Sequence, residues 1–333
     1  MKASAIAHSN IALCKYWGKR NEELILPFNA NISMTLNKFF THTTLEFDKK
    51  YDKDILVIND KEYANETKEY KLYVGRFLRV VRERVNTDLY ARIVSNNNFP
   101  LAAGLASSAS GFAALAIAVN EIFNLSLDKN GLSILARQGS GSAARSIHGG
   151  FVEWLKGENE NGEDSYAKQV FDENYWPEFR MIACITSTEE KKYKSRPSMQ
   201  MSVETSPYFK QWAEGSDEDV QKVKQGLREK DFTLVGTTAE HSCMKMNGVM
   251  WTTKPAIIYQ NQTTIELMHA IMQWREEGLE SYYTMDAGPQ VKILCLEKDV
   301  DVLVEKLSKF DGVEKVVVNK PGYDAKVVSE HLF

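Results

Sequence analysis

The chain has 333 residues, 43% of them hydrophobic and 26% charged, which is enough for a substantial core in one large domain or two ordinary ones. Its net charge of −4 argues against nucleic acid as the main partner, because a phosphate backbone demands a broad basic face. A small anionic substrate stays compatible with this charge, since it needs only a local cluster of Lys and Arg.

The cysteines and the N-terminus indicate a reducing compartment. The four cysteines form no C-x-x-C pair, which disfavours a zinc site, and three of them lie in apolar stretches typical of buried thiols. The segment Met1–His8 has no signal-peptide pattern. No segment reaches the roughly 20 apolar residues of a membrane span. We therefore expect a cytoplasmic enzyme with no membrane partner.

The first half of the chain is predicted to combine short strands with three helices. A strand and turn are indicated over 6–16, and a loop that leads into a strand over 26–36. Further strands are indicated over 41–47, 55–58, 89–95 and 151–154. Helices are indicated over 69–85, from about 111 to 123, and over 127–138. The first is amphipathic, and the second is apolar on nearly every face, which is typical of a helix buried at the centre of a domain.

A second unit begins near Met181 and alternates differently. Strands are indicated over 181–186, 282–285, 291–296 and 314–318, and helices over 217–228, 232–246, 265–277 and 300–310. Thr263 or Thr264 is the expected cap of the third helix. This order fits a ferredoxin-like α+β layer. No linker rich in Pro or Gly separates the halves, so we expect them to share an interface.

The stretch 99–111 is rich in Gly, Ala and Ser and runs directly into the apolar helix. Backbone N–H groups at a helix start have no intrahelical partner, and the helix dipole favours an anion there. The stretch matches neither the Gly-Lys-Ser/Thr nucleotide loop nor the G-x-G-x-x-G pattern. It therefore predicts a different kind of polyphosphate site, most simply for ATP, and the segment 139–146 repeats its chemistry.

Within this loop, hydroxyl and amide groups are the candidate ligands of the nucleotide. Ser107 and Ser108 are the predicted contacts to the ATP phosphates and to Mg²⁺, with Ser107 as the candidate metal ligand. Ala103, Gly104 and Leu105 offer backbone N–H groups, and Gly104 allows a backbone conformation that a β-carbon would forbid. The six histidines show no metal-ligand spacing.

Five segments, taken in order, resemble the diphosphomevalonate decarboxylase family. They are 10–20, 99–111, 139–146, 149–154 and 286–289. The similarity runs from Ala3 to about Leu296. The combination of Lys-Tyr-Trp-Gly-Lys near the start with Asp-Ala-Gly-Pro near the end is the specific part. It separates this family from other members of the kinase superfamily that includes galactokinase, homoserine kinase and mevalonate kinase.

The resemblance implies a two-lobe α+β fold of the kinase superfamily. The N-terminal lobe (1–182) would resemble domain 2 of ribosomal protein S5 and bind ATP, and the C-terminal lobe (183–333) would be ferredoxin-like, with the active site in the cleft between them. The implied reaction phosphorylates the tertiary 3-hydroxyl of mevalonate 5-diphosphate. Loss of phosphate and carbon dioxide then gives isopentenyl diphosphate. We also expect a homodimer.

Two charged residues carry the implied chemistry. The resemblance assigns Asp286 to the 3-hydroxyl of the substrate, as general base or as electrostatic orienter; the alternative is an ordinary turn aspartate. Arg145 stands where a helix start is expected, although the helix dipole would disfavour a cation there. Its planar fork suits a carboxylate, and the resemblance implies that it holds the C1 carboxylate of the substrate.

The segment 15–19 supplies further candidates. By resemblance, Lys19 and Tyr16 contact the diphosphate end and the reacting region of the substrate, Lys19 also counting among the catalytic residues, while Asn10 lies near the 3-hydroxyl. Packing in the core is the alternative for the aromatic residues, and we expect it of Trp17. Lys15 is expected to be a solvated residue.

Serines and a basic segment complete the predicted substrate site. Ser140 and Ser142 match substrate-contacting serines of the family, although helix capping is an alternative role. The basic loop 191–198 is either a solvated face or a lid over the substrate phosphates. Ser195 and Arg196 match the family positions there, and Ser198 also fits as the serine.

Two departures from the family pattern and three competing functions stay open. Gln290 replaces the usual Asn, and 244–251 replaces a stretch that often carries His-Ala-Thr. The competing functions are a decarboxylase of the 5-phosphate, a 3-kinase that does not decarboxylate, and a non-catalytic module that binds ATP. A non-catalytic relative is expected to have lost Asp286 or Arg145, and this chain retains both.

Overall fold

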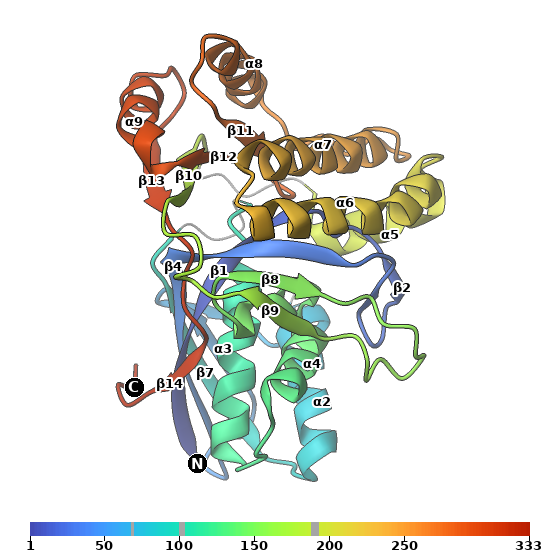
Figure 1. Cartoon of the computed structure of the whole chain (residues 1–333). Helices are drawn as coiled ribbons and strands as arrows, with labels where there is room; N and C mark the ends of the chain where they lie inside the picture. Colours follow the sequence, from blue (N-terminus) through green and yellow to red (C-terminus); the bar gives the residue numbers. More distant parts are fainter. Residues whose placement is uncertain (68–69, 100–103, 188–192) are drawn as a thin grey trace.

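The computed structural model of the chain describes residues 1–67, 70–99, 104–187 and 193–333. Two β-sheets, each covered by helices, are arranged one above the other in Figure 1. Among the described residues, every helix is too short or too polar to cross a lipid bilayer.

The larger sheet lies in the N-terminal half and has the strand order β14-β1-β4-β7-β5-β6, with β8 and β9 attached to β4. Its strands are β1 (Lys2–Cys14), β4 (Asn31–Asp48), β5 (Ile55–Ile58), β6 (Lys61–Tyr63), β7 (Tyr90–Asn97), β8 (Phe151–Trp154), β9 (Ala167–Phe171) and β14 (Lys326–Val328). Neighbouring strands are antiparallel except β5 and β7. A separate small ribbon consists of β2 (Lys19–Asn21) and β3 (Leu26–Pro27).

One long strand, β4, replaces the strand predicted to follow a loop within 26–36 and the separate strand predicted over 41–47. Its first part, Asn31–Met34, pairs with β8, and its second part, Thr41–Asp48, pairs with β7. The whole of β4 also follows β1, with register shifts that bend the pair. The polar residues between the two parts therefore mark a change of partner and not a break in the strand.

Helices cover one face of this sheet (Figure 1). They are η1 (Lys71–Gly75), α2 (Arg76–Val85), α3 (Ser107–Ile122), α4 (Lys129–Gly139) and the 3₁₀ helix η2 (Gly141–Ile147). The prediction for α3 is confirmed, because apolar side chains on nearly all of its sides are buried. Asp128 caps α4 by accepting a hydrogen bond from the Gly131 N–H.

The second sheet is antiparallel, with the strand order β11-β12-β10-β13. Its elements are β10 (Phe179–Ile185), α5 (Ser195–Thr205), α6 (Phe209–Glu229), α7 (Phe232–Trp251), α8 (Gln262–Glu276), β11 (Tyr282–Thr284), β12 (Val291–Leu296), η3 (Glu297–Asp299), α9 (Val300–Ser308) and β13 (Lys315–Asn319). Asn261 caps α8, so the predicted threonine cap is wrong. Thr264 instead completes a reciprocal capping box with it.

The two halves share a hydrophobic core, which confirms the predicted interface. A single cluster of buried side chains includes Ile11 and Met34 from the first sheet, Val223 from α6, Val235 from α7 and Leu294 from β12. The chain also returns to the N-terminal sheet at its end, where β14 pairs with β1. No strand is predicted from the sequence at this end of the chain, and both termini lie in the lower part of the molecule in Figure 1.

Candidate active site

A cavity of about 380 Å³ lies between the two halves of the chain and receives side chains from both. Most of the predicted site residues line it: Asn10, Tyr16, Lys19, Gly104, Ser107, Ser108, Ser140, Ser142, Arg145, Ser195, Arg196 and Asp286. Leu105 is buried next to these residues without lining the cavity. Ala103 lies outside the described residues.

The phosphate loop, as we call the residues from Gly104 to Ser108, opens α3 towards this cavity. Ala106 precedes the helix in a left-handed conformation with φ of 56°, and its methyl side chain cannot cap the helix start. Gly104 has φ of +79°, and a β-carbon there would lie 3.0 Å from Cα of Gly288. The loop therefore leaves its first helical N–H groups available to an anion, and it touches the turn that carries Asp286.

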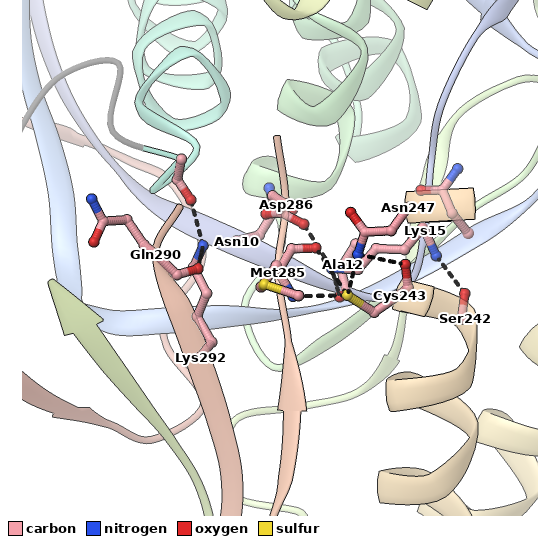
Figure 2. Close-up of polar contacts among 12 residues, drawn as sticks. Asn10, Ala12, Lys15, Ser242, Cys243, Asn247, Met285, Asp286, Gln290 and Lys292 are labelled. Atoms are coloured by element: carbon pink, nitrogen blue, oxygen red, sulfur yellow. Dashed lines mark hydrogen bonds and ion pairs between the residues drawn. The ribbon is translucent and has the colours of Figure 1, made fainter. Parts of the chain in front are cut away.

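Asp286 forms an ion pair with Lys15, whose Nζ lies 2.8 Å from Oδ1 (Figure 2). Lys15 also donates to the Ala12 carbonyl at 2.7 Å, and only 1% of its side chain is exposed. The prediction that Lys15 is solvated is wrong, because its ammonium is buried between the Ala12 carbonyl and the Asp286 carboxylate. Met285, just before Asp286, is held by its N–H to Sγ of Cys243 on α7 at 3.1 Å.

Charge around Asp286 keeps it ionised. Burial raises the pKa of this carboxyl, but Lys15, Lys292 and Arg145 outweigh the burial and hold the pKa below its ordinary value. A carboxylate of this kind is a weak proton acceptor and a strong partner for a hydroxyl donor or a cation.

Arg145 lies in the last turn of η2 and is buried, so the prediction that it stands at a helix start is wrong. The C-terminal end of a helix favours a cation. Its Nε donates to Oδ1 of Asn10 at 3.0 Å, and its Nη1 donates to Oδ1 of Asn31. Burial lowers the pKa of Arg145 to about 10, which leaves it protonated at neutral pH. Two neutral amides orient this cation without neutralising it.

The two serine-rich segments meet at the cavity wall. Oγ of Ser108 lies 3.3 Å from Oγ of Ser140, which in turn lies 3.4 Å from Oγ of Ser142. Asn10 reaches the same wall and donates to the Ser142 carbonyl at 3.0 Å and to Oγ of Ser146 at 2.7 Å. A row of hydroxyl groups therefore connects the start of α3 with η2.

Lys19 and Tyr16 both line the cavity. Lys19 is almost fully buried, and its Nζ donates to Oε2 of Glu22 at 2.7 Å. The Tyr16 ring packs edge-on against Trp154, with 4.8 Å between ring centroids. Its hydroxyl is buried without a hydrogen-bond partner among the described residues. Trp17 is packed in the core, as predicted.

The basic segment begins a helix, because Ser195 and Arg196 are the first residues of α5. Ser195 lines the cavity, whereas Ser198 is buried beside Tyr259 and does not. Arg196 donates to backbone carbonyls on η1 and α4, and its Cζ lies 4.1 Å from the ring centroid of Tyr73. The prediction of a loop is therefore wrong for residues 195–198, which are helical. Residues 188–192 lie outside the described residues.

Lys292 is a buried residue near the site, and it is not among the site residues predicted from the sequence. Its Nζ donates to the Gly104 carbonyl at 2.6 Å from β12 (Figure 2). The sequence does contain one hint of its role: Lys292 is a charged residue in an otherwise apolar strand, shortly after the Asp-Ala-Gly-Pro turn. No group of three His, Cys, Asp or Glu side chains forms a metal cluster within the described ranges.

Comparison with known proteins agrees with this geometry. Residues 7–167 match the family model "Diphosphomevalonate decarboxylase-like N-terminal domain", and residues 181–328 match "Mevalonate 5-diphosphate decarboxylase C-terminal domain". The diphosphomevalonate decarboxylase of Danio rerio is 38% identical over 314 residues, which cover 90% of this chain and 78% of that protein.

Solved structures extend the similarity to the whole fold. A mevalonate diphosphate decarboxylase from Enterococcus faecalis superposes with a TM-score of 0.90 and 37% identity, covering 98% of this chain and 99% of that chain. A structure described as MDDEF in complex with MVAPP, AMPPCP and magnesium has a TM-score of 0.92 and 38% identity, with the same coverage. By both sequence and structure, the chain belongs to the diphosphomevalonate decarboxylase family.

Proposed function

We propose that this chain carries out the reaction of its family, the ATP-dependent decarboxylation of mevalonate 5-diphosphate in isoprenoid biosynthesis. The products are isopentenyl diphosphate, ADP, phosphate and carbon dioxide. One observation carries the proposal: an ionised Asp286, a buried Arg145 and the phosphate loop surround a single cavity.

The first step is transfer of a phosphoryl group to the tertiary 3-hydroxyl, which turns a poor leaving group into a good one. Asp286 orients this hydroxyl by accepting its hydrogen bond, and it takes up the proton as the hydroxyl oxygen bonds to the γ-phosphorus of ATP and the bond to ADP breaks. The lowered pKa of Asp286 supports this role over that of a strong base. Phosphoryl transfer depends mainly on positioning and electrostatic stabilisation, so a weak base is sufficient.

The second step is loss of phosphate and carbon dioxide. The electrons of the breaking bond between the carboxylate and its neighbouring carbon form the new double bond as the 3-phosphate departs. Arg145 holds the carboxylate before this step, since its guanidinium is oriented by two neutral amides and keeps its full charge. Fixed charges around the electron-poor carbon contribute most of the stabilisation.

The phosphate loop and a neighbouring cavity suit ATP. A second cavity of about 230 Å³ adjoins the first and shares Tyr63, Tyr73, Ser107 and Ser108 with it. Its inner wall is apolar and includes Phe112, so we place the nucleoside there and the phosphates at the start of α3. Leu105 contributes its backbone N–H.

Magnesium fits this site only as a partner of the nucleotide. The described cavity wall offers hydroxyl groups and a single carboxylate, Asp286, which is already paired with Lys15. Mg²⁺ usually keeps several waters and binds through substrate phosphates with few protein ligands. Ser107 is the candidate protein ligand, and the ion would neutralise charge on the transferring phosphoryl group.

The diphosphate end of the substrate is assigned to the basic and hydroxyl groups of the remaining wall. Lys19 and Arg196 supply charge, and Tyr16 has a buried hydroxyl that lacks a hydrogen-bond partner among the described residues. Ser140, Ser142 and Ser195 add hydroxyl groups, and Asn10 lies between this wall and the expected 3-hydroxyl.

We also retain the proposed lobes, 1–182 and 183–333, with the fold of ribosomal protein S5 domain 2 and a ferredoxin-like fold. The order of the second sheet supports the latter name, because numbering its strands along the chain gives 2-3-1-4. The homodimer and the cytoplasmic location stay predictions from the sequence.

A panel assay tests the function. Mevalonate, its 5-phosphate and its 5-diphosphate are supplied separately with ATP and Mg²⁺, and ADP, phosphate and carbon dioxide are measured in parallel. Equal release of all three products from the 5-diphosphate alone is expected. Release of ADP without carbon dioxide indicates a 3-kinase, and activity on the 5-phosphate alone indicates the other decarboxylase.

A further inference from the structure

Lys292 is a fully buried lysine that lowers the pKa of Asp286, but the proposed reaction assigns it no contact with ATP or with the substrate. We infer that Lys292 is a positioning residue: its ammonium fixes the Gly104 carbonyl so that the phosphate loop presents its amides to the nucleotide. This inference rests on the proposed function, because it concerns the same phosphate site.

The contacts of Lys292 join two turns that are far apart in the sequence. Its Nζ donates to the Gly104 carbonyl at 2.6 Å and to the Gln290 carbonyl at 3.1 Å (Figure 2). Gln290 directly follows the turn that carries Asp286, and Gly104 opens the phosphate loop. One ammonium therefore connects the loop that would hold the phosphoryl donor with the turn that would hold its acceptor.

The hydrogen bond from Lys292 to the Gly104 carbonyl also determines the direction of the neighbouring amide N–H group. In a trans peptide, the carbonyl of one residue and the N–H of the next point in opposite directions. Because the Gly104 carbonyl faces Lys292, the N–H of Leu105 points away from β12. Oγ of Ser9 holds the Leu105 carbonyl in the same way, at 2.5 Å, so the N–H of Ala106 is also fixed. Gly104 and Ala106 both line the cavity.

A cation at the carbonyl end of a peptide does more than fix its direction. A charged donor makes a shorter and stronger hydrogen bond than a neutral one, and bonded groups polarise each other inside a protein. The N–H of Leu105 thereby becomes a better donor to a phosphate oxygen. Ala106, the N-cap residue of α3, has no side chain that could cap the helix, so the loop depends on such backbone support.

Close contact between the two turns makes their separation sensitive to Lys292. A β-carbon at Gly104 would lie 3.0 Å from Cα of Gly288, so the loop and the turn already touch. Phosphoryl transfer needs donor and acceptor in line, and a displacement of about 1 Å can cost about 10²-fold in rate. Loss of the shared ammonium is expected to affect both ATP binding and turnover.

The test compares Lys292→Met with Lys224→Met in the full-length chain. Lys224 forms an ion pair with Glu153 at 2.9 Å, and neither residue lines the cavity, so its loss controls for removal of a structural lysine. We expect Lys292→Met to raise KM for ATP by about tenfold and to lower kcat by about 10–10²-fold. KM for mevalonate 5-diphosphate stays near the parent value, and Lys224→Met changes none of these constants.

A second variant and a binding measurement keep the inference open to contradiction. Lys292→Gln keeps a hydrogen-bond donor without the charge, and it is expected to weaken calorimetric binding of the ATP analogue AMPPCP by about fivefold. Parent-like affinity for AMPPCP and parent-like KM for ATP in either folded variant would overturn the inference. A parent protein inactive on mevalonate 5-diphosphate contradicts the proposed function, whereas AMPPCP affinity tests Lys292 whatever the acceptor.

Discussion

The two serine-rich segments of the cavity have similar compositions and different structures. Residues 104–108 lead into an α-helix through a left-handed Ala106, whose side chain cannot cap the helix start. Residues 139–147 end one helix and form a buried 3₁₀ helix, whose last turn carries Arg145. The first segment therefore offers backbone N–H groups to the cavity, and the second offers a guanidinium.

The two segments have similar compositions, but their different structures suit them to bind different groups. Small residues permit a close approach of backbone to an anion in both segments, but the direction of each helix decides which charge faces the cavity. We assign the nucleotide to the first segment and the substrate carboxylate to the second. The turn that carries Asp286 contacts the first segment through Gly288. The charge of Arg145, in the second segment, helps to lower the pKa of the Asp286 carboxyl.

The largest loss of activity is expected from a change at Asp286, whose turn contacts the first segment and whose charge interacts with the second. Asp286→Ala removes the group that would orient the 3-hydroxyl, and turnover should fall by about 10²–10⁴-fold. ATP binding should stay near the parent value, since the phosphate loop keeps its backbone. Steady-state kinetics and AMPPCP calorimetry measure the two quantities. A variant that turns over near the parent rate would remove Asp286 from the mechanism.

Arg145→Lys tests the second segment alone. Lysine keeps the charge but cannot donate to two acceptors in one plane while holding a carboxylate, so kcat should fall by about 10²-fold. KM for ATP should change little. Arg180→Lys, at a residue that forms an ion pair with Glu297 outside the cavity, is the matched control. Parent-like kinetics of Arg145→Lys contradict the assignment of the carboxylate to this segment.

Gly104→Ala tests the first segment. The new β-carbon meets Gly288 at 3.0 Å and forces a residue with φ of +79° into a conformation that costs about 1–3 kcal/mol. KM for ATP should rise by about tenfold, with KM for the substrate less affected. Gly248→Ala in α7, where an added β-carbon meets nothing within 4 Å, is the control and should leave both constants unchanged. Equal effects of the two variants argue against a specific role for the loop.

The charge of Asp286 also predicts a pH dependence. Lys15, Lys292 and Arg145 face this carboxyl and lower its pKa, so the active, ionised form persists below the ordinary range. Activity should be lost only as pH falls through that lowered value. Lys15→Met removes one of these charges and should move the acid limb of kcat/KM to higher pH. If the acid limb of kcat/KM does not move in a folded Lys15→Met variant, Lys15 does not control the ionisation of Asp286.

The residues of the site are largely predictable because their signals are local. Short motifs place Asp286, Arg145 and the serines in sequence, and the shared core of the two halves brings these motifs to one cavity. Periodicity likewise predicts α3 and α4, since burial on one or all faces of a helix is visible in the sequence.

The environment of each charge is not predictable in the same way. Lys15 stands among polar and aromatic neighbours and is predicted to be solvated, yet its partner Asp286 lies far along the chain. The environment of Lys292 is equally hard to predict, because the carbonyl that accepts its hydrogen bond belongs to Gly104, in the other half of the chain. The strand β14 also depends on a distant partner, β1. Long-range pairing of this kind leaves no periodic signal.

The smallest expected effect concerns the wall that would hold the diphosphate. Lys19 is buried and forms an ion pair with Glu22 at 2.7 Å, while 47% of the Glu22 side chain is exposed. Burial lowers the pKa of Lys19, and Glu22 opposes this change. Glu22 therefore competes with an incoming anion for Lys19, and half-exposed pairs of this kind are worth about 0–1 kcal/mol.

Glu22→Gln should lower KM for mevalonate 5-diphosphate by about two- to fivefold at neutral pH, without changing KM for ATP. The gain should disappear at alkaline pH, because Lys19 loses its proton more easily when Glu22 no longer supports it. Steady-state kinetics at both pH values measure the change, with Glu23→Gln as the control. A rise in KM at neutral pH would mean that Glu22 positions Lys19 for the diphosphate and does not compete with it.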